Sequence, residues 1–394
     1  MVLTSQSRPL DGVRVLDLTA NVAGPLACQV LADLGAEVIK VEPSAGEAAR
    51  RIISTIPGAE HITPYFSPNN RGKLSVRLDL SDSDGADVFT ELVRSADVVV
   101  QGMRPGALER RGFGPERVAA LNPRCIYASL SAYGGGSPME DRPGIDMTVQ
   151  AEAGCLSGQP AGQAPRLIPF QLIDGATGHV LAQAVLAALL HRERSGVVNR
   201  VDVSLYDVAC SLQANYLTLQ LNRPERRESG AVRTGRGAVA VEPSGVFETG
   251  DGCLVLAAYV PAHWRTLVEV IERPDLADDP RFVDQASRSV NAGALRAELS
   301  EVLRGRTAAE WVDIFESAGL MVARANTWSD VVASELFERR CLAQPAVQDG
   351  RAITVIRTPA RYSTFDTTAP TEVPGLGEHD EALTGEAMEQ RNGS

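Results

Sequence analysis

With 394 residues, the chain exceeds the length at which a single hydrophobic core usually stops growing, so it predicts two domains. Hydrophobic residues make up 44% of it, as in ordinary globular proteins, and its net charge is −12. This charge argues against nucleic acid as a general partner, because phosphates select positively charged surfaces. The N-terminus lacks the apolar stretch of a signal peptide, and the longest apolar run, 180–190, is too short to span a bilayer. We expect a soluble cytoplasmic protein with no nucleic-acid or membrane partner.

The first third of the chain alternates strand-like and helix-like segments. Periodicity and β-branched residues predict strands and helices in turn, at 13–18, 25–36, 37–42, 74–80, 83–96, 97–103, 115–122 and 125–131. Strands that alternate with helices predict a parallel sheet covered on both faces. The predicted fold class is therefore α/β, with a Rossmann-like domain. NAD is disfavoured as its ligand, because the loop after the first strand, TANVAGP, lacks the G-x-G-x-x-G pattern.

A lone acidic residue, Asp174, follows an apolar run and directly precedes a long, mostly apolar helical segment. Unpaired backbone N–H groups and the helix dipole favour negative charge at such a position, so the carboxylate could stay ionised while shielded from water. By position alone, a plain helix N-cap is the more common reading.

The pattern changes after residue 222, where an Arg-, Gly- and Ser-rich segment predicts a linker. A hairpin follows at 245–260, with its turn at 250–252, and then helices at 264–271, 292–305 and 307–319. These elements predict a smaller α+β domain at 223–327. Beyond it, 329–340 predicts a helix and 352–359 a strand.

Six cysteines and five histidines are scattered without C-x-x-C or any other metal-ligand spacing. Single thiols in such a chain are usually small buried apolar groups. We expect neither a disulfide framework nor a metal site.

Several segments together resemble one family. The chain resembles a class III (CaiB/BaiF-type) CoA-transferase at Pro9 to Thr19, Ala23 to Pro25, Leu31 to Pro43, Asn70 to Leu80, Arg104 to Gly114, Asn122 to Gly134, Arg142 to Gly154, the Asp174 segment and Pro374 to Leu383. The resemblance implies a large Rossmann-like CoA-binding domain built from both chain ends, 1–222 and 328–394, and two subunits threaded through each other as an interlocked homodimer. It also implies no permanently bound cofactor, with coenzyme A and acyl-CoA as substrates.

The resemblance implies a role for Asp174 as the nucleophile that attacks an acyl-CoA thioester and carries CoA to a carboxylic acid through an aspartyl anhydride and an aspartyl-CoA thioester. We expect Gly175 and Gly178 to leave room for the thioester. For CoA binding, the matching basic residues are Lys73, Arg104, Arg110 and Arg111. Val22 and Met103 match positions that line the pantetheine and acyl pocket.

The chain departs from some relatives at the motif RPGIDM. The related α-methylacyl-CoA racemases carry His where this chain has Ile145, and isoleucine cannot exchange protons. Asp146 and Asp174 could still form an acid and base pair, so an acyl-CoA racemase or isomerase is the alternative. A non-catalytic acyl-CoA binder is the third hypothesis.

Transferases that act on oxalate carry Gln at the place of Val22, and a run of glycines for which the nearest match here is the sparser segment Gly230 to Gly237. These differences disfavour oxalate as the acceptor.

Overall fold

The computed structural model describes residues 7–157, 164–222, 241–258, 260–368 and 371–393. Its contacts divide the chain into two compact units: Met1–Leu156, Leu167–Asn222 and Arg340–Ser394 form the larger, and Ser157–Arg166 with Arg223–Arg339 the smaller. The return to the larger unit falls at residue 340 instead of the expected 328, because two short helices stay with the smaller unit. The linker and the glycine segment Gly230 to Gly237 lie outside the described residues.

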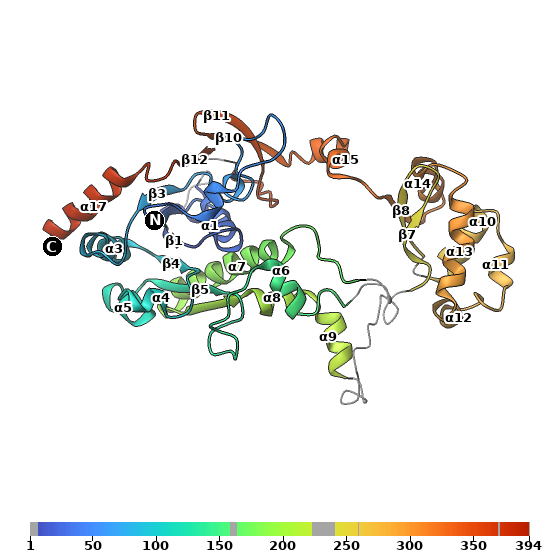
Figure 1. Cartoon of the computed structure of the whole chain (residues 1–394), viewed down its shortest axis with the longest axis horizontal. Helices are drawn as coiled ribbons and strands as arrows, with labels where there is room; N and C mark the ends of the chain where they lie inside the picture. The colour runs from blue at the N-terminus through green and yellow to red at the C-terminus, as the bar shows by residue number, and fades with distance from the viewer. Residues whose placement is uncertain (1–6, 158–163, 223–240, 259, 369–370, 394) are drawn as a thin grey trace. The chain divides into compact units, whose positions relative to one another are not determined.

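The larger unit is built on a six-stranded parallel sheet in the order β3-β2-β1-β4-β5-β6 (Figure 1). Its strands are β1 (Arg14–Leu18), β2 (Glu37–Glu42), β3 (Leu74–Arg77), β4 (Val98–Gln101), β5 (Ile126–Ser131) and β6 (Arg200–Ser204). The first five confirm the predicted strands. Strand β6 was not predicted: only its last two residues are buried, so its apolar pattern is weak.

Neighbouring residues of each strand point to opposite faces of the sheet, and each face has its own core. Val15 packs on one face and Leu16 on the other, and Val98 and Val99 divide in the same way. The first core is covered by α1 (Ala23–Asp33), α6 (Asp146–Glu152), α7 (Leu172–Ser195) and α8 (Leu205–Leu212). The second is covered by α3 (Ser83–Ser95), α4 (Ala107–Arg110), α5 (Pro115–Leu121) and the C-terminal helix α17 (Asp380–Gly393).

Both ends of the chain build this unit, as Figure 1 shows where α17 lies beside α3. The strands β10 (Ala343–Gln348), β11 (Arg351–Ile356) and β12 (Glu372–Val373) form a second small sheet. This sheet packs on Ala49 and Phe66. The remaining elements of the unit are η1 (Ala48–Arg51), α2 (Ser67–Asn70) and α9 (Ala214–Leu221).

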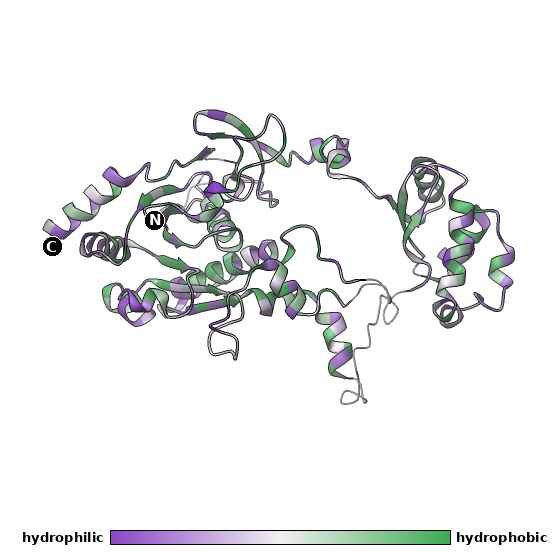
Figure 2. Cartoon of the chain, in the orientation of Figure 1, coloured by the Kyte–Doolittle hydropathy of each residue, from purple (hydrophilic) through white to green (hydrophobic). Residues whose placement is uncertain are grey.

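The smaller unit is an α+β body. The predicted hairpin is present as β7 (Ser244–Glu248) and β8 (Cys253–Ala257), which pair antiparallel, and β9 (Met321–Arg324) joins them. Figure 2 shows both hydrophobic and hydrophilic colour on helices such as α13, as expected where one face of a helix is buried. Its helices are α10 (Pro261–Val270), α11 (Asp275–Asp278), α12 (Gln285–Val290), α13 (Ala292–Leu303), α14 (Ala308–Ser317), α15 (Trp328–Val332) and α16 (Glu335–Arg339).

By length and composition alone, one described helix, α7, could cross a membrane, a test that the core helices of soluble proteins also pass. In this fold α7 packs on the parallel sheet and against α1. Gly178 allows that approach, because a Cβ there would lie 2.8 Å from the Ala23 carbonyl oxygen and 2.9 Å from the Leu26 side chain. Gly178 therefore serves helix packing, and the expectation that it leaves room for substrate is wrong.

Candidate active site

A pocket of 520 Å³ opens in the larger unit at the carboxyl ends of the central strands. Residues 20–23 follow β1, Gly102 follows β4, and residues 130–132 end β5, and all of them line it. The strand order reverses between β1 and β4, and ligands of open parallel sheets bind outside the carboxyl ends at such a reversal. Sheet topology alone therefore points to this pocket, and Asp174 and Asp146 both line it.

Asp174 is the third residue of α7, one turn after the N-cap residue Gln171. The plain N-cap reading is therefore wrong, because the cap position belongs to another residue. The first four N–H groups of the helix already have acceptors: Leu172 and Gly175 donate to the carbonyl oxygens of Phe170 and Gln171, and the two between them donate to Asp146. Within the described residues, the Asp174 carboxylate itself accepts no hydrogen bond.

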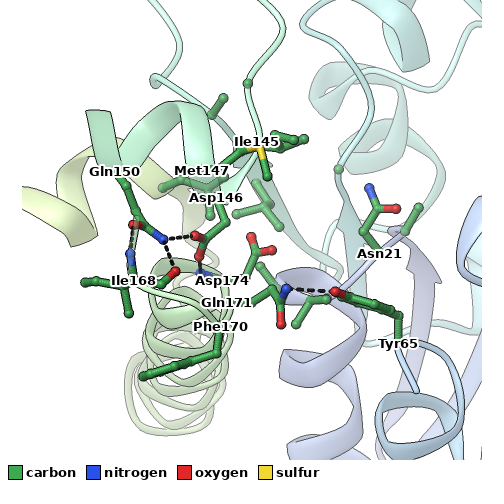
Figure 3. Close-up of a pocket in the computed structure, with 18 of the residues that line it drawn as sticks. Asn21, Tyr65, Ile145, Asp146, Met147, Gln150, Ile168, Phe170, Gln171 and Asp174 are labelled. Atoms are coloured by element: carbon green, nitrogen blue, oxygen red, sulfur yellow. Dashed lines mark hydrogen bonds between the residues drawn. The ribbon is translucent and has the colours of Figure 1, made fainter. Parts of the chain in front are cut away.

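Asp146, the first residue of α6, fixes the start of α7. Its Oδ2 accepts the backbone N–H groups of Ile173 at 2.8 Å and Asp174 at 2.9 Å. Its Oδ1 accepts the side-chain amide of Gln150 at 2.6 Å. Figure 3 shows this arrangement, with Gln150 reaching on to the backbone of Ile168. Asp146 is therefore a positioning residue whose two oxygens are already engaged.

The two carboxylates set the electrostatics of the pocket. Burial, and secondly the negative charge of Asp146, raise the pKa of Asp174 to about 6. Its carboxyl is then ionised at neutral pH, yet weakly solvated and without an ion-pair partner in the described structure. Such a group is more nucleophilic than an exposed aspartate. Its environment differs from the expected one, because Asp146 takes the helix N–H groups that were expected to favour its charge.

Tyr65 and Gln171 form a hydrogen-bonded pair on the side of Asp174 away from Asp146 (Figure 3). Gln171 Nε2 donates to the Tyr65 hydroxyl oxygen at 2.9 Å. The tyrosine O–H proton remains available to a ligand, since Tyr65 donates to no described acceptor. Sequence reasoning missed both residues. The position of Gln171, the residue before α7 and three residues before Asp174, was a usable signal, but Tyr65 lies more than a hundred residues away and gave none.

Lys73 is not a CoA contact in this structure. It is 2% exposed, and its ammonium group donates to Asp17 Oδ2 at 2.8 Å, the Pro25 carbonyl oxygen at 2.9 Å and Asn70 Oδ1 at 2.9 Å. All three N–H groups are used inside the protein, so none is left for a phosphate. The prediction failed because burial of a lysine among acidic partners cannot be read from its local motif.

Lys73 belongs to a buried group that we call the Asp17 cluster: Asp17, Lys40, Glu47 and Lys73. Burial opposes the charge of Asp17, but Lys40 and Lys73 outweigh it and hold its pKa well below the usual range.

The cluster holds the loop after β1. Lys40 donates to the Thr19 carbonyl oxygen at 3.1 Å, and Glu47 accepts the backbone N–H of Asn21 at 3.0 Å. Asn21 has a left-handed φ of 67°, which costs energy outside glycine. Together these bonds fix the wall of the pocket that contains Val22.

The other predicted CoA contacts are two apolar residues and three arginines. Val22 lines the pocket as expected. Met103 does not, because it packs half-buried against the second core. Arg104 lies just beyond the end of β4, and Arg110 and Arg111 lie at the end of α4. All three are exposed, and none has an acidic partner in the described part of the chain. They remain free to bind phosphate groups.

Gly175 meets nothing within 4 Å at the position that a Cβ would take, so it does leave open space next to Asp174. The described residues contain no group of three or more His, Cys, Asp or Glu that could hold a metal ion. No disulfide joins any of the six cysteines, all of which lie in the described part of the chain.

Known proteins resemble this chain over most of its length. A family model described as CoA-transferase family III matches residues 10–380. A protein named probable fatty acyl-CoA transferase Rv3272, from Mycobacterium tuberculosis, is 50% identical over 96% of this chain and 98% of its own length. The succinate–glutarate CoA-transferase of Agrobacterium fabrum is 31% identical over 98% of this chain and 97% of its own.

Solved structures of known proteins are similar to this chain as well. The orthorhombic crystal form of Rv3272 superposes with a TM-score of 0.86 at 50% identity, covering 96% of this chain and 99% of that one. A CaiB/BaiF family protein from Brucella suis gives a TM-score of 0.84 at 29% identity, covering 97% of this chain and all of that one.

Proposed function

The chain belongs to CoA-transferase family III and is a CoA-transferase, and from this premise we propose that it moves CoA from an acyl-CoA to a carboxylic acid through covalent intermediates on Asp174. The observation that carries the proposal is the environment of Asp174. Its carboxylate lines the pocket, is partly buried, accepts no hydrogen bond from the described residues and has a raised pKa.

The first half of the reaction takes the acyl group onto the enzyme. An Asp174 oxygen attacks the thioester carbonyl, and collapse of the tetrahedral adduct breaks the C–S bond, which gives an acyl-aspartyl anhydride and CoA thiolate. The thiolate then attacks the aspartyl carbonyl, which releases the donor acid as a carboxylate and leaves an aspartyl-CoA thioester. Each step exchanges one acyl bond for another, so no ATP and no net proton are consumed.

The second half reverses these events with the acceptor. Its carboxylate attacks the aspartyl-CoA carbonyl and expels CoA thiolate, and the thiolate attacks the acceptor carbonyl of the new anhydride. The new acyl-CoA leaves and the Asp174 carboxylate is restored.

Each tetrahedral adduct carries an oxyanion that needs a donor, and the O–H of Tyr65 supplies one in this proposal. Gln171 orients the hydroxyl, whose proton is free to donate. One preorganised donor of this kind contributes about 3 kcal/mol. Tyr65→Phe should therefore lower kcat with little change in KM.

The bonding of Asp146 does not favour the isomerase alternative. A base at Cα needs a lone pair aimed at the substrate, whereas Asp146 already accepts three hydrogen bonds, two from the start of α7 and one from Gln150, at about four lone-pair sites. Incorporation of solvent deuterium at Cα of an acyl-CoA would support the isomerase over the transferase. A non-catalytic binder would show affinity for CoA and neither reaction.

Trapping the intermediates tests the proposal. The protein is incubated with a broad panel of acyl-CoA donors and acids, treated with hydroxylamine during turnover and mapped by peptide mass spectrometry. We expect a hydroxamate at residue 174 and loss of CoA transfer in Asp174→Ala. The matched control is Asp207→Asn, since Asp207 is also the third residue of its helix but lies outside the pocket. Full transfer activity in Asp174→Ala would overturn the proposal.

The family resemblance also leads us to propose a cytoplasmic interlocked homodimer with no permanently bound cofactor. The exposed arginines Arg104, Arg110 and Arg111 supply the charge for CoA phosphates in this proposal. Light scattering after gel filtration measures the subunit number, and a monomer that is fully active would contradict the dimer.

A further inference from the structure

The residues that line the pocket around Asp174 include two acids, Asp146 and Asp174, and no lysine, arginine or histidine among the described lining residues. The first of these acids is 7% exposed and holds the helix start, and the second is the proposed nucleophile. A second carboxylate brought into this pocket by a substrate would find like charge and no counter-charge. Both effects disfavour its ionised form.

The rest of the pocket is suited to alkyl groups. Five large apolar side chains that line it are 43–54% exposed: Ile52, Ile145, Met147, Leu167 and Phe170. Large apolar side chains that gather at a concave site while still exposed mark a surface that binds an apolar ligand. Figure 3 shows Ile145 and Met147 on the same side of the pocket as Asp146, near Asp174.

From this combination we propose that the enzyme selects acids with one carboxylate and an apolar chain, and rejects dicarboxylic acids for lack of a counter-charge. This proposal rests on the proposed CoA transfer and specifies its substrate class. The single carboxylate of the acid is used at Asp174, where it becomes part of the anhydride and loses its charge. The chain beyond it then lies against the apolar side chains. A dicarboxylic acid would keep its second charge in the same place.

A binding experiment tests the selectivity without any chemistry. S-hexyl-CoA and S-(5-carboxypentyl)-CoA are thioethers of nearly equal length that Asp174 cannot cleave. Titration calorimetry on the full chain should give at least tenfold tighter binding for the hexyl compound. In Asp174→Asn the difference in affinity between the two thioethers should become smaller, because one of the two like charges is gone. Equal affinities in the wild-type protein would overturn the proposal, whether or not CoA transfer is observed.

An exchange experiment tests it during turnover. Hexanoyl-CoA is incubated with ¹³C-labelled hexanoate or with labelled hexanedioate, and label in the CoA thioester is followed by mass spectrometry. Hexanoate should enter at least tenfold faster. Faster entry of hexanedioate would refute the selectivity while supporting CoA transfer. Absence of exchange with every acid, together with no adduct on Asp174, would refute the transfer itself and leave the thioether titration to decide the selectivity.

A third experiment introduces a positive charge into the pocket. Met147→Lys keeps the length of the side chain and adds a cation where the side chain is 51% exposed. It should reduce the preference for the hexyl over the carboxypentyl thioether at least threefold, whereas the neutral control Met147→Gln should not. An unchanged preference in Met147→Lys would show that missing counter-charge does not set the selectivity.

Discussion

Two aspartates near the carboxyl edge of the same sheet have opposite environments. Asp17, at 0% exposed, lies between Lys40 and Lys73, and its pKa is held well below the usual range. Asp174 has an acid as its charged neighbour, and its pKa is raised to about 6. Asp17 is fully buried and Asp174 partly buried, and burial alone would raise the pKa of both, so burial does not explain the opposite shifts. The counter-charges explain them: Lys40 and Lys73 hold the Asp17 carboxylate in the loop that lines the pocket, whereas the Asp174 carboxylate has no cationic partner in the described structure.

The largest expected effect is on stability. Asp17→Asn should lower the free energy of unfolding by about 3–5 kcal/mol, because it leaves buried Lys40 and Lys73 without their shared partner. Asp174→Asn should instead raise the free energy of unfolding at pH 8. Urea denaturation of both variants measures the difference, and equal stabilities would show that the comparison is wrong.

The expected gain in Asp174→Asn depends on pH. Folded Asp174 holds its proton up to about pH 6, whereas the unfolded chain releases it near pH 4. The folded state thus binds more protons in this window, and the unfolding free energy of the wild-type protein falls as pH rises through it. The Asp174→Asn substitution should raise the unfolding free energy by on the order of 1–2 kcal/mol at pH 8 and should not change it below about pH 4.

The two glycines beside Asp174 offer a second test. Gly178→Ala should destabilise the protein by about 1–3 kcal/mol, because its Cβ would press on α1. Gly175→Ala is the matched control on the same helix, and it should leave the melting temperature unchanged or slightly raised, since its Cβ meets open space. If Gly175→Ala alone impairs acyl-CoA binding, that space belongs to the substrate.

Substitutions can also distinguish an exposed arginine that is free to bind CoA from the buried Lys73. Arg110→Ala should raise the KM for acyl-CoA about tenfold with an unchanged melting temperature, since the exposed guanidinium has no acidic partner in the described structure. Lys73→Met should lower the melting temperature and show no selective rise in KM. A selective rise in KM for Lys73→Met would restore it as a CoA contact.

The smallest expected effect is a shift of the pH profile. The kcat/KM of the wild-type enzyme should rise with an apparent pKa near 6, as Asp174 ionises. Asp146→Asn should move this limb to lower pH but keep it above the usual range for aspartate, because burial remains. Asp207→Asn should leave it in place. An unmoved limb in Asp146→Asn would show that Asp146 acts only through its hydrogen bonds.

Much of the fold could be predicted from periodicity. Five of the six parallel strands and the hairpin β7–β8 follow patterns that local sequence carries. The segment 329–340 was expected to be one helix but forms two short ones, α15 and α16. Asp174, Asp146 and Val22 were identified from motifs and do line one pocket. Lys73 and Met103 carry the same kind of motif evidence but lie elsewhere, because a motif records chain position and not the direction of a side chain.

The sequence by itself determined the alternation of strands and helices, the family and the choice of Asp174, since these depend on local pattern and residue identity. Tertiary structure decided the chemical state of each charged group, because that state depends on neighbours brought together from distant segments. It paired Asp17 with Lys40 and Lys73, set Asp146 against the start of α7 and placed Tyr65 beside Gln171. Electrostatic interactions fall off with distance in space and not along the chain.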